Sequence, residues 1–150
     1  EIGGGLRSCL SVLQAFAPGP RAGLRSCQCI AFDISDEAQV VNARQHPAEQ
    51  YRVGDVREGL DQPDDSAEFV YSSHLIEHLA DPYCLIEEQL RICKKGGLCV
   101  IAAPLHMYHR EHRQVLTIDA VVGMLKDFAN PVICHVDSHD TEIVAGIFKP

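Results

Sequence analysis

The feature that most constrains this chain is a run of three glycines at positions 3–5, which directly follows Ile2. An apolar residue followed by glycines is typical of a strand that ends in a tight loop, where glycine allows positive φ and lets a ligand approach the backbone. Apolar residues then recur at helical spacing from Leu6 to Phe16. The free N–H groups of such a helix would face the same ligand. We therefore predict a strand, a glycine loop and a helix, the start of a nucleotide-type site, with the first strand truncated.

Length and composition bound the class of protein. The 150 residues, 46% of them hydrophobic, predict one globular domain over residues 1–150. No apolar run is long enough to span a bilayer, so we expect no membrane span. The net charge of −8 disfavours non-specific binding to nucleic acid. Seven cysteines, mostly beside apolar residues, favour buried reduced thiols and a cytoplasmic location.

Hydrophobic periodicity and breaker residues predict alternating strands and helices. Strands that alternate with helices favour a mostly parallel sheet with both faces covered. The last two strands lack an intervening helix, so one of them should run antiparallel. The expected strands are 27–32, 51–53, 68–73, 98–103, 131–136 and 142–148, and the expected helices are 35–45, 81–93 and 117–128.

Polar residues follow the ends of these predicted strands. In open α/β sheets, ligands bind beyond the carboxyl ends of the strands. Asp33 ends the second strand, where a carboxylate can accept hydrogen bonds from both ribose hydroxyls. Asp55 ends the third, within reach of an adenine edge. The alternative is that both side chains only cap turns.

Six stretches occur in the order EIGGG (1–5), FDIS (32–35), GDV (54–56), FVYSSHLIEHL (69–79), DP (81–82) and LRICKKGG (90–97). In this order the chain resembles the class I S-adenosylmethionine-dependent methyltransferases, of the group called type 11. The resemblance implies an α/β, Rossmann-like three-layer sandwich, whose mostly parallel seven-stranded sheet ends in an antiparallel C-terminal edge hairpin. It also implies S-adenosylmethionine as cofactor and a small-molecule, sugar or lipid methyl acceptor.

The resemblance further implies which residues hold the cofactor. These are Glu1, Gly3, Gly4 and Gly5 around the methionine moiety and the ribose, Asp33 at the ribose hydroxyls, Ile34 on the adenine, Asp55 and Val56 at the adenine amino edge, and Ser73 and His74 near the methyl-bearing sulfur. One residue departs from the family pattern: Arg7 stands where the family usually has another glycine, and it adds bulk to the loop.

Methyl transfer from a sulfonium needs mainly alignment, plus a base for a poor nucleophile. His78 and His109 are the candidate bases. The pair Glu77 and His78 could instead only fix the turn after the strand. Three histidines at spacing three, His106, His109 and His112, could suggest a metal, but a zinc site needs a fixed scaffold and a further ligand, so we expect none. Contact with the acceptor is the other interpretation of this loop.

Two other functions stay open. In an NAD(P)-dependent oxidoreductase the acid would follow the glycines by about 20 residues, whereas Asp33 lies 28 residues past Gly5. No Tyr-x-x-x-Lys pair is present either. The second alternative is a catalytically inactive methyltransferase-like binding module, which the bulk of Arg7 motivates.

Overall fold

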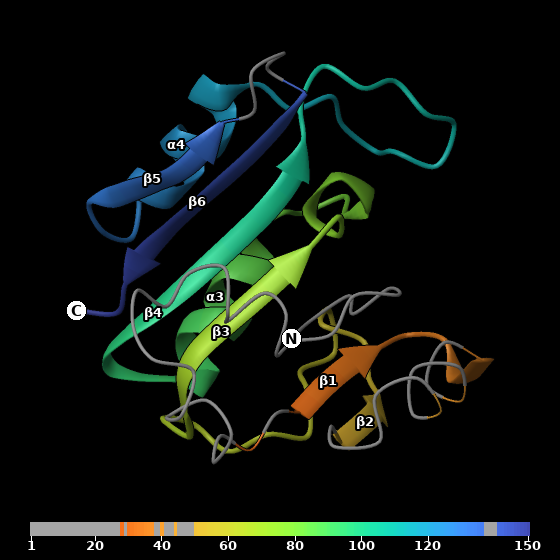
Figure 1. The fold of residues 1–150 in the computed structure, drawn as a ribbon, viewed down its shortest axis with the longest axis vertical. Helices are drawn as coiled ribbons and strands as arrows, with labels where there is room; N and C mark the ends of the chain where they lie inside the picture. Colours follow the sequence, from red (N-terminus) through yellow and green to blue (C-terminus); the bar gives the residue numbers. More distant parts are fainter. Residues whose placement is uncertain (1–27, 29, 38–39, 41–43, 45–49, 137–140) are drawn as a thin grey trace.

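The computed structural model describes residues 28, 30–37, 40, 44, 50–136 and 141–150, with the backbone alone for 133–136. Figure 1 shows the arrangement of the elements. They are β1 (Ile30–Asp33), β2 (Gln50–Val53), β3 (Ala67–Ser73), the 3₁₀ helix η2 (Ile76–His78), α3 (Tyr83–Ile92), β4 (Cys93–Pro104), α4 (Ile118–Lys126), β5 (Pro131–Val136) and β6 (Glu142–Phe148).

The described strands form two groups. β1 pairs with β2 in parallel, and four further strands follow the order β3-β4-β6-β5. In the second group β3 and β4 are parallel, whereas β6 runs antiparallel to both β4 and β5. The expected C-terminal hairpin is thus confirmed. The pairings β1–β2 and β3–β4 are parallel and both pairings of β6 are antiparallel, so the described sheets are mixed and the expectation of a mostly parallel sheet is confirmed in part. The count of seven strands stays a prediction, because the described residues contain six.

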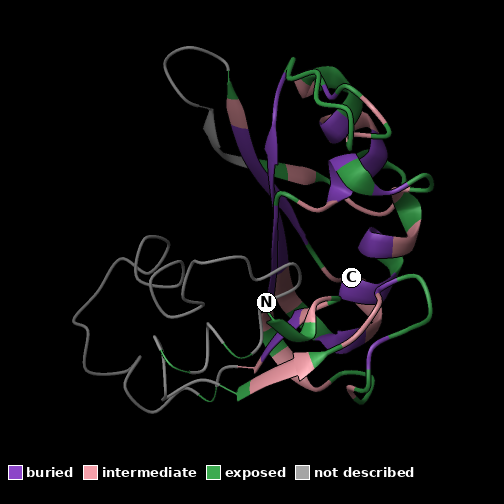
Figure 2. Ribbon diagram, turned by 90° about the vertical axis from the view of Figure 1, so that its right-hand side faces the viewer, coloured by how far each residue is buried: buried purple, intermediate pink, exposed green. Residues whose placement is uncertain are grey.

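The central strands are buried on both faces, as their continuous apolar runs predict. One face packs against α3 and α4, which lie on the same side of the four-stranded sheet (Figure 2). The opposite face has its own buried cluster, formed by Tyr71, Val100, Ala102 and Val144. The helix expected at 6–16, which would belong to a third layer, lies outside the described residues. Four described residues of the helix expected at 35–45 have helical backbone: Asp36, Glu37, Val40 and Arg44.

Helices α3 and α4 begin within two residues of the predicted starts at 81 and 117. The Asp81 carboxylate accepts a hydrogen bond from the Tyr83 N–H (3.0 Å), and Pro82 already has helical backbone angles. The Thr117 hydroxyl accepts one from the Ala120 N–H (3.1 Å) at the start of α4. None of the described helices combines the length and the apolar character that a membrane crossing requires.

The strand after α3 begins earlier than expected. The sequence predicts a helix stop at 94–97 and a strand from 98, but β4 starts at Cys93, directly after α3. Cys93 pairs with Ala67, and the register then shifts so that Leu98 pairs with Phe69. Gly96 takes the positive φ of 77° that this irregular stretch requires. Pairing with β3 thus extends β4 over residues 93–97, although the lysines and glycines of this stretch favour a turn.

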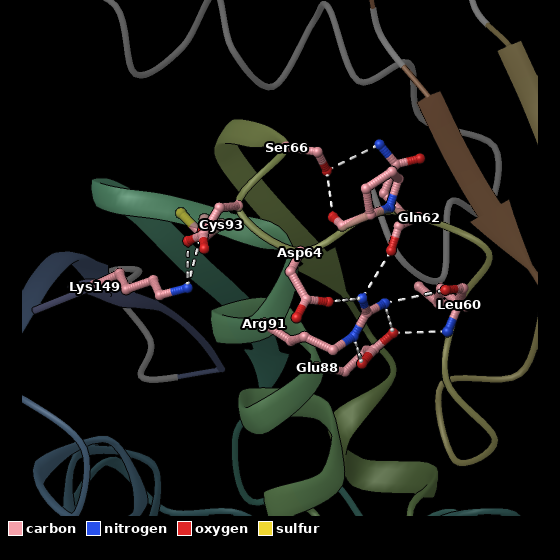
Figure 3. Close-up of polar contacts among 10 residues, drawn as sticks. Leu60, Gln62, Asp64, Ser66, Glu88, Arg91, Cys93 and Lys149 are labelled. Carbon is pink, nitrogen blue, oxygen red and sulfur yellow. Dashed lines mark hydrogen bonds and ion pairs between the residues drawn. The ribbon is translucent and has the colours of Figure 1, made fainter.

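The segment 57–66, which is rich in polar and acidic residues, is anchored to α3 (Figure 3). Leu60 is buried in the core, and its N–H donates to a carboxylate oxygen of Glu88 (2.6 Å). The Arg91 guanidinium donates to the carbonyls of Leu60 (3.0 Å) and Gln62 (2.7 Å), and it also pairs with Asp64. Its bonds to Glu88 hold the pKa of that carboxyl below the usual value. The polar composition of the loop gave no sign of this attachment.

Candidate functional site

The carboxyl ends of β1 and β2 lie side by side. Asp33 is paired with Val53 in the parallel register, and the Asp33 carbonyl accepts a hydrogen bond from the Gly54 N–H (2.9 Å). The Asp33 side chain is half-buried, and its Oδ1 accepts from the Ser35 N–H (2.9 Å). Among the described residues no partner is recorded for the other oxygen, Oδ2. Asp33 therefore caps a turn, as the alternative interpretation predicts, and within the described part of the chain only its Oδ1 is engaged.

The next residues along these two loops differ in exposure. Ile34, expected to pack on an adenine ring, is 63% exposed. Val56, expected at the adenine edge, is only 6% exposed and belongs to the hydrophobic core. A ligand at this end of the sheet could therefore contact the side chain of Ile34, but only the main chain of Val56.

Asp55 is already engaged by a neighbouring side chain. The Arg57 Nε donates to both Asp55 oxygens (2.9 and 3.0 Å), and the Arg57 guanidinium closes an ion pair with the same carboxylate. The Arg57 N–H adds a bond to Oδ1 (2.9 Å). These hydrogen bonds hold the pKa of the Asp55 carboxyl below its usual value. An adenine amino group would have to compete with Arg57, a contact that no sequence motif indicated.

The glycine loop is not part of the described structure. Its predicted cofactor residues and the bulky departure from the family pattern lie outside the described residues: Glu1, Gly3, Gly4, Gly5 and Arg7. Their assignments stay predictions.

The carboxyl end of β3 carries the next two expected residues. Ser73 is buried and ends the strand, and His74 takes a left-handed backbone with φ of 49°. The His74 N–H donates to the carbonyl of Ala102 (2.9 Å), which ties the turn to β4. Its half-exposed ring has Nδ1 3.8 Å from Glu77 and Nε2 3.8 Å from Glu142. A positive φ in a non-glycine residue at a strand end is a feature that clusters at functional sites.

Glu77 is the most unusual residue of this turn. It is 1% exposed, and its Oε2 has no hydrogen-bond partner among the described residues. Its Oε1 lies 3.8 Å from His74 Nδ1 and 3.8 Å from His78 Nε2, too far for a normal hydrogen bond. The sequence placed Glu77 in the turn after a predicted strand but gave no indication that its carboxylate is buried.

The loop after β4 folds back onto the η2 turn. The Arg113 N–H donates to the Glu77 carbonyl (2.8 Å), and the Gln114 amide donates to the Ile76 carbonyl (2.9 Å). This docking brings the ring of His112 against that of His78, edge to face with centroids 4.9 Å apart. His112 is thus a site residue that the sequence flagged only by its spacing to other histidines.

The two candidate bases are placed differently. His78 is held at the strand end beside Glu77 and His112, with Nδ1 3.2 Å from the Glu111 carbonyl. His109 lies on the exposed part of the loop, and its ring contacts that of His112 with centroids 5.4 Å apart. The structure therefore brings one of the two to the strand end and leaves the other at the loop surface.

A family model described as a methyltransferase domain matches residues 5–101, more than half of the chain. The chain therefore belongs to this family of methyltransferase domains, for which S-adenosylmethionine is the implied cofactor. A comparison with curated protein sequences gives no significant match.

Solved structures with the same fold are distant in sequence. A SAM-dependent methyltransferase from Aquifex aeolicus is 14% identical, with a TM-score of 0.74 over 99% of this chain and 80% of its own. The Haloferax volcanii complex of the Trm112 methyltransferase activator with a candidate methyltransferase is 19% identical. Its TM-score is 0.69 over 99% of this chain and 80% of its own. The [4+2]-cyclase SpnF is 15% identical, with a TM-score of 0.66 over 89% of this chain and 51% of its own. At such identities these likenesses establish the α/β fold alone.

Proposed function

We propose that this chain is an S-adenosylmethionine-dependent methyltransferase that acts on a small-molecule, sugar or lipid acceptor at the carboxyl ends of β1, β2 and β3. The observation that carries the proposal is the placement of acidic and polar residues there: Asp33, Asp55 and His74 each end or follow one of these strands. In Figure 1, β1 and β3 point the same way, so their carboxyl ends face the same side of the molecule.

The described residues suit the adenosyl part of this cofactor. The Asp33 Oδ2 is an acceptor for a ribose hydroxyl, and the exposed Ile34 side chain offers an apolar surface to an adenine ring. Asp55 fits less simply, because an amino group must displace an exposed Arg57 side chain. Exposed ion pairs stabilise by at most about 1 kcal/mol, so this displacement costs little.

The chain's own contribution to the reaction is alignment and, for a poor nucleophile, proton removal. When bound, the cofactor supplies a methyl group on a sulfonium, which leaves as a neutral thioether. Of the two candidate bases, His78 is better supported than His109, since its ring is fixed at the end of β3 by Glu111 and His112.

Calorimetric titration with S-adenosylmethionine tests the proposal, with NAD as a second ligand. We expect micromolar binding of the first and none of the second. Replacing Asp33 by Ala should weaken binding at least about tenfold, or roughly 1.4 kcal/mol, because the ribose hydroxyls lose their acceptor. Asp36→Ala, an exposed carboxylate three residues further along, is the matched control and should leave the affinity unchanged.

Equal affinities for the wild type and Asp33→Ala would remove the ribose assignment, and binding of NAD would favour the oxidoreductase. The absence of binding for either ligand would favour the inactive binding module. The engagement of both Asp55 oxygens by Arg57 is the structural observation on the side of that module.

A further inference from the structure

Three potential metal ligands meet where the loop after β4 docks on the η2 turn. One carboxylate oxygen of Glu77 and one ring nitrogen each of His78 and His112 lie within 4.8 Å of one another. Two of these residues are adjacent in the turn after β3, and the third comes from the loop after β4. This set differs from the His106, His109 and His112 series that the sequence suggested.

Both imidazoles are held in an orientation that suits metal binding. His78 Nδ1 lies 3.2 Å from the Glu111 carbonyl, and His112 Nδ1 lies 3.2 Å from the Met107 carbonyl. A carbonyl oxygen only accepts hydrogen bonds, so each Nδ1 must be the protonated donor. The lone pair of each neutral ring is then on Nε2. Donation of the other ring N–H to a carbonyl is the usual outer-shell support of a metal-bound histidine.

The third ligand supplies an independent observation. Glu77 is almost fully buried, yet its Oε2 has no hydrogen-bond partner among the described residues. Burying a carboxylate without hydrogen bonds is costly, and buried charges are normally paired or coordinate a metal. Its other oxygen lies 3.8 Å from His78 Nε2, a gap too wide for a hydrogen bond. A cation bound at Oε1 would neutralise the buried carboxylate and take a lone pair from both rings, and bidentate binding would also engage Oε2.

We propose that Glu77, His78 and His112 bind a divalent first-row transition metal ion of the Zn²⁺ class. Two imidazoles and one carboxylate match the three protein ligands of a catalytic zinc site with an open position, whereas Mg²⁺ and Ca²⁺ prefer oxygen ligands. Tetrahedral ligands about 2.0–2.1 Å from zinc lie about 3.3 Å apart. The 3.8 Å separation of Glu77 Oε1 and His78 Nε2 must therefore close by about half an ångström, and the widest separation in the set, within 4.8 Å, by at most about 1.5 Å.

The position of this ion indicates the class of acceptor, a step that depends on the proposed function. The site adjoins His74 at the end of β3, where the methyl-bearing sulfur is expected. A cation there favours an acceptor that presents a hydroxyl oxygen, because coordination makes the hydroxyl proton easier to lose. In the transfer that proton goes to water, the oxygen lone pair forms the new O–C bond, and the electrons of the broken C–S bond stay on sulfur. His78, as a ligand, would then not serve as the base.

The test uses tag-free, chelator-treated protein titrated with Co²⁺ by visible absorption and with Zn²⁺ by calorimetry. We expect one equivalent to bind with micromolar affinity and a cobalt spectrum of low-coordinate type, unaffected by millimolar Mg²⁺. His112→Ala and Glu77→Gln should each weaken binding at least about tenfold. His109→Ala is the matched control, because this exposed ring lies in the same loop and outside the ligand set; its affinity should stay within about twofold of the wild type.

No binding by the wild type, or equal losses in His109→Ala and His112→Ala, would overturn the metal site. Circular dichroism and urea unfolding of each variant establish that a loss reflects the ligand and not the fold. The S-adenosylmethionine affinity of the wild-type protein, measured beside its metal affinity, separates the two proposals. Retained cofactor binding without metal binding refutes only the metal site, whereas metal binding without cofactor binding refutes only the proposed methyltransferase.

Discussion

Two buried glutamates, Glu77 in the η2 turn and Glu88 in α3, have very different hydrogen-bond environments. Glu88 accepts hydrogen bonds from the Leu60 N–H (2.6 Å) and from Arg91 on both oxygens (2.7 Å each). Glu77 is at least as buried, but one of its oxygens has no described partner and the other has only imidazoles at 3.8 Å. The first carboxylate is hydrogen-bonded on both oxygens and holds a loop in place, while the second has no hydrogen bond among the described residues.

Local geometry accounts for the difference. Glu88 and Arg91 are three residues apart on one helix, so their side chains meet on the same face and reach the loop together. Glu77 lies in a 3₁₀ turn whose polar neighbours are histidines, of which His78 and His112 donate their Nδ1 protons to main-chain carbonyls. A buried carboxylate with hydrogen bonds to both oxygens therefore indicates a structural role. A buried carboxylate without them indicates a candidate binding site.

The largest expected effect is a loss of stability when Glu88, the hydrogen-bonded glutamate, loses its partner Arg91. Arg91→Ala leaves Glu88 buried without its cation and frees the carbonyls of Leu60 and Gln62, so we expect a loss of about 2–3 kcal/mol in unfolding free energy. Urea unfolding measures it. Lys94→Ala is the control, since the ion pair of Lys94 with Glu68 is exposed and should contribute at most about 1 kcal/mol. A similar small loss for Arg91→Ala would show that the network does not stabilise the loop.

Glu77→Gln should have a smaller effect on the stability of the metal-free protein, and of the opposite kind. Removing a buried charge that lacks hydrogen bonds relieves a desolvation cost, so we expect no loss, or a gain of up to about 1 kcal/mol. Glu88→Gln is the mirror variant and should lose about 1–2 kcal/mol, because it weakens charge-assisted bonds from Arg91. Equal losses in the two variants would break the comparison and make Glu77 a structural charge.

The smallest effect concerns Asp55, a half-buried carboxylate whose two oxygens both accept hydrogen bonds from Arg57. Arg57→Ala removes the guanidinium from both Asp55 oxygens and leaves only the main-chain bond to Oδ1. S-adenosylmethionine should therefore bind equally well or up to about fivefold more tightly, at most about 1 kcal/mol. Calorimetric titration under the conditions used for Asp33→Ala measures the change. A weaker affinity would mean that Arg57 positions Asp55 for the ligand instead of competing with it.

Much of the fold could be predicted because its signals are local. The caps at Asp81 and Thr117 fix helix starts through bonds to the next turn, and the apolar strand patterns depend on neighbours along the chain. The predicted strand ends also placed Asp33, Asp55 and His74 where the structure has them. The start of β4 at Cys93 could not be predicted in this way, because it depends on pairing with Ala67 in another strand.

The sequence by itself determined the alternation of strands and helices, the C-terminal hairpin and the polar strand ends, since each follows from the identity of residues close in the chain. Only the tertiary structure decided which buried carboxylates have hydrogen-bond partners. Whether Glu88 meets Leu60, or Glu77 and His78 meet His112, depends on how distant loops dock. The free energy of a buried carboxylate is set by the partners within a few ångströms in space, and sequence spacing does not specify them.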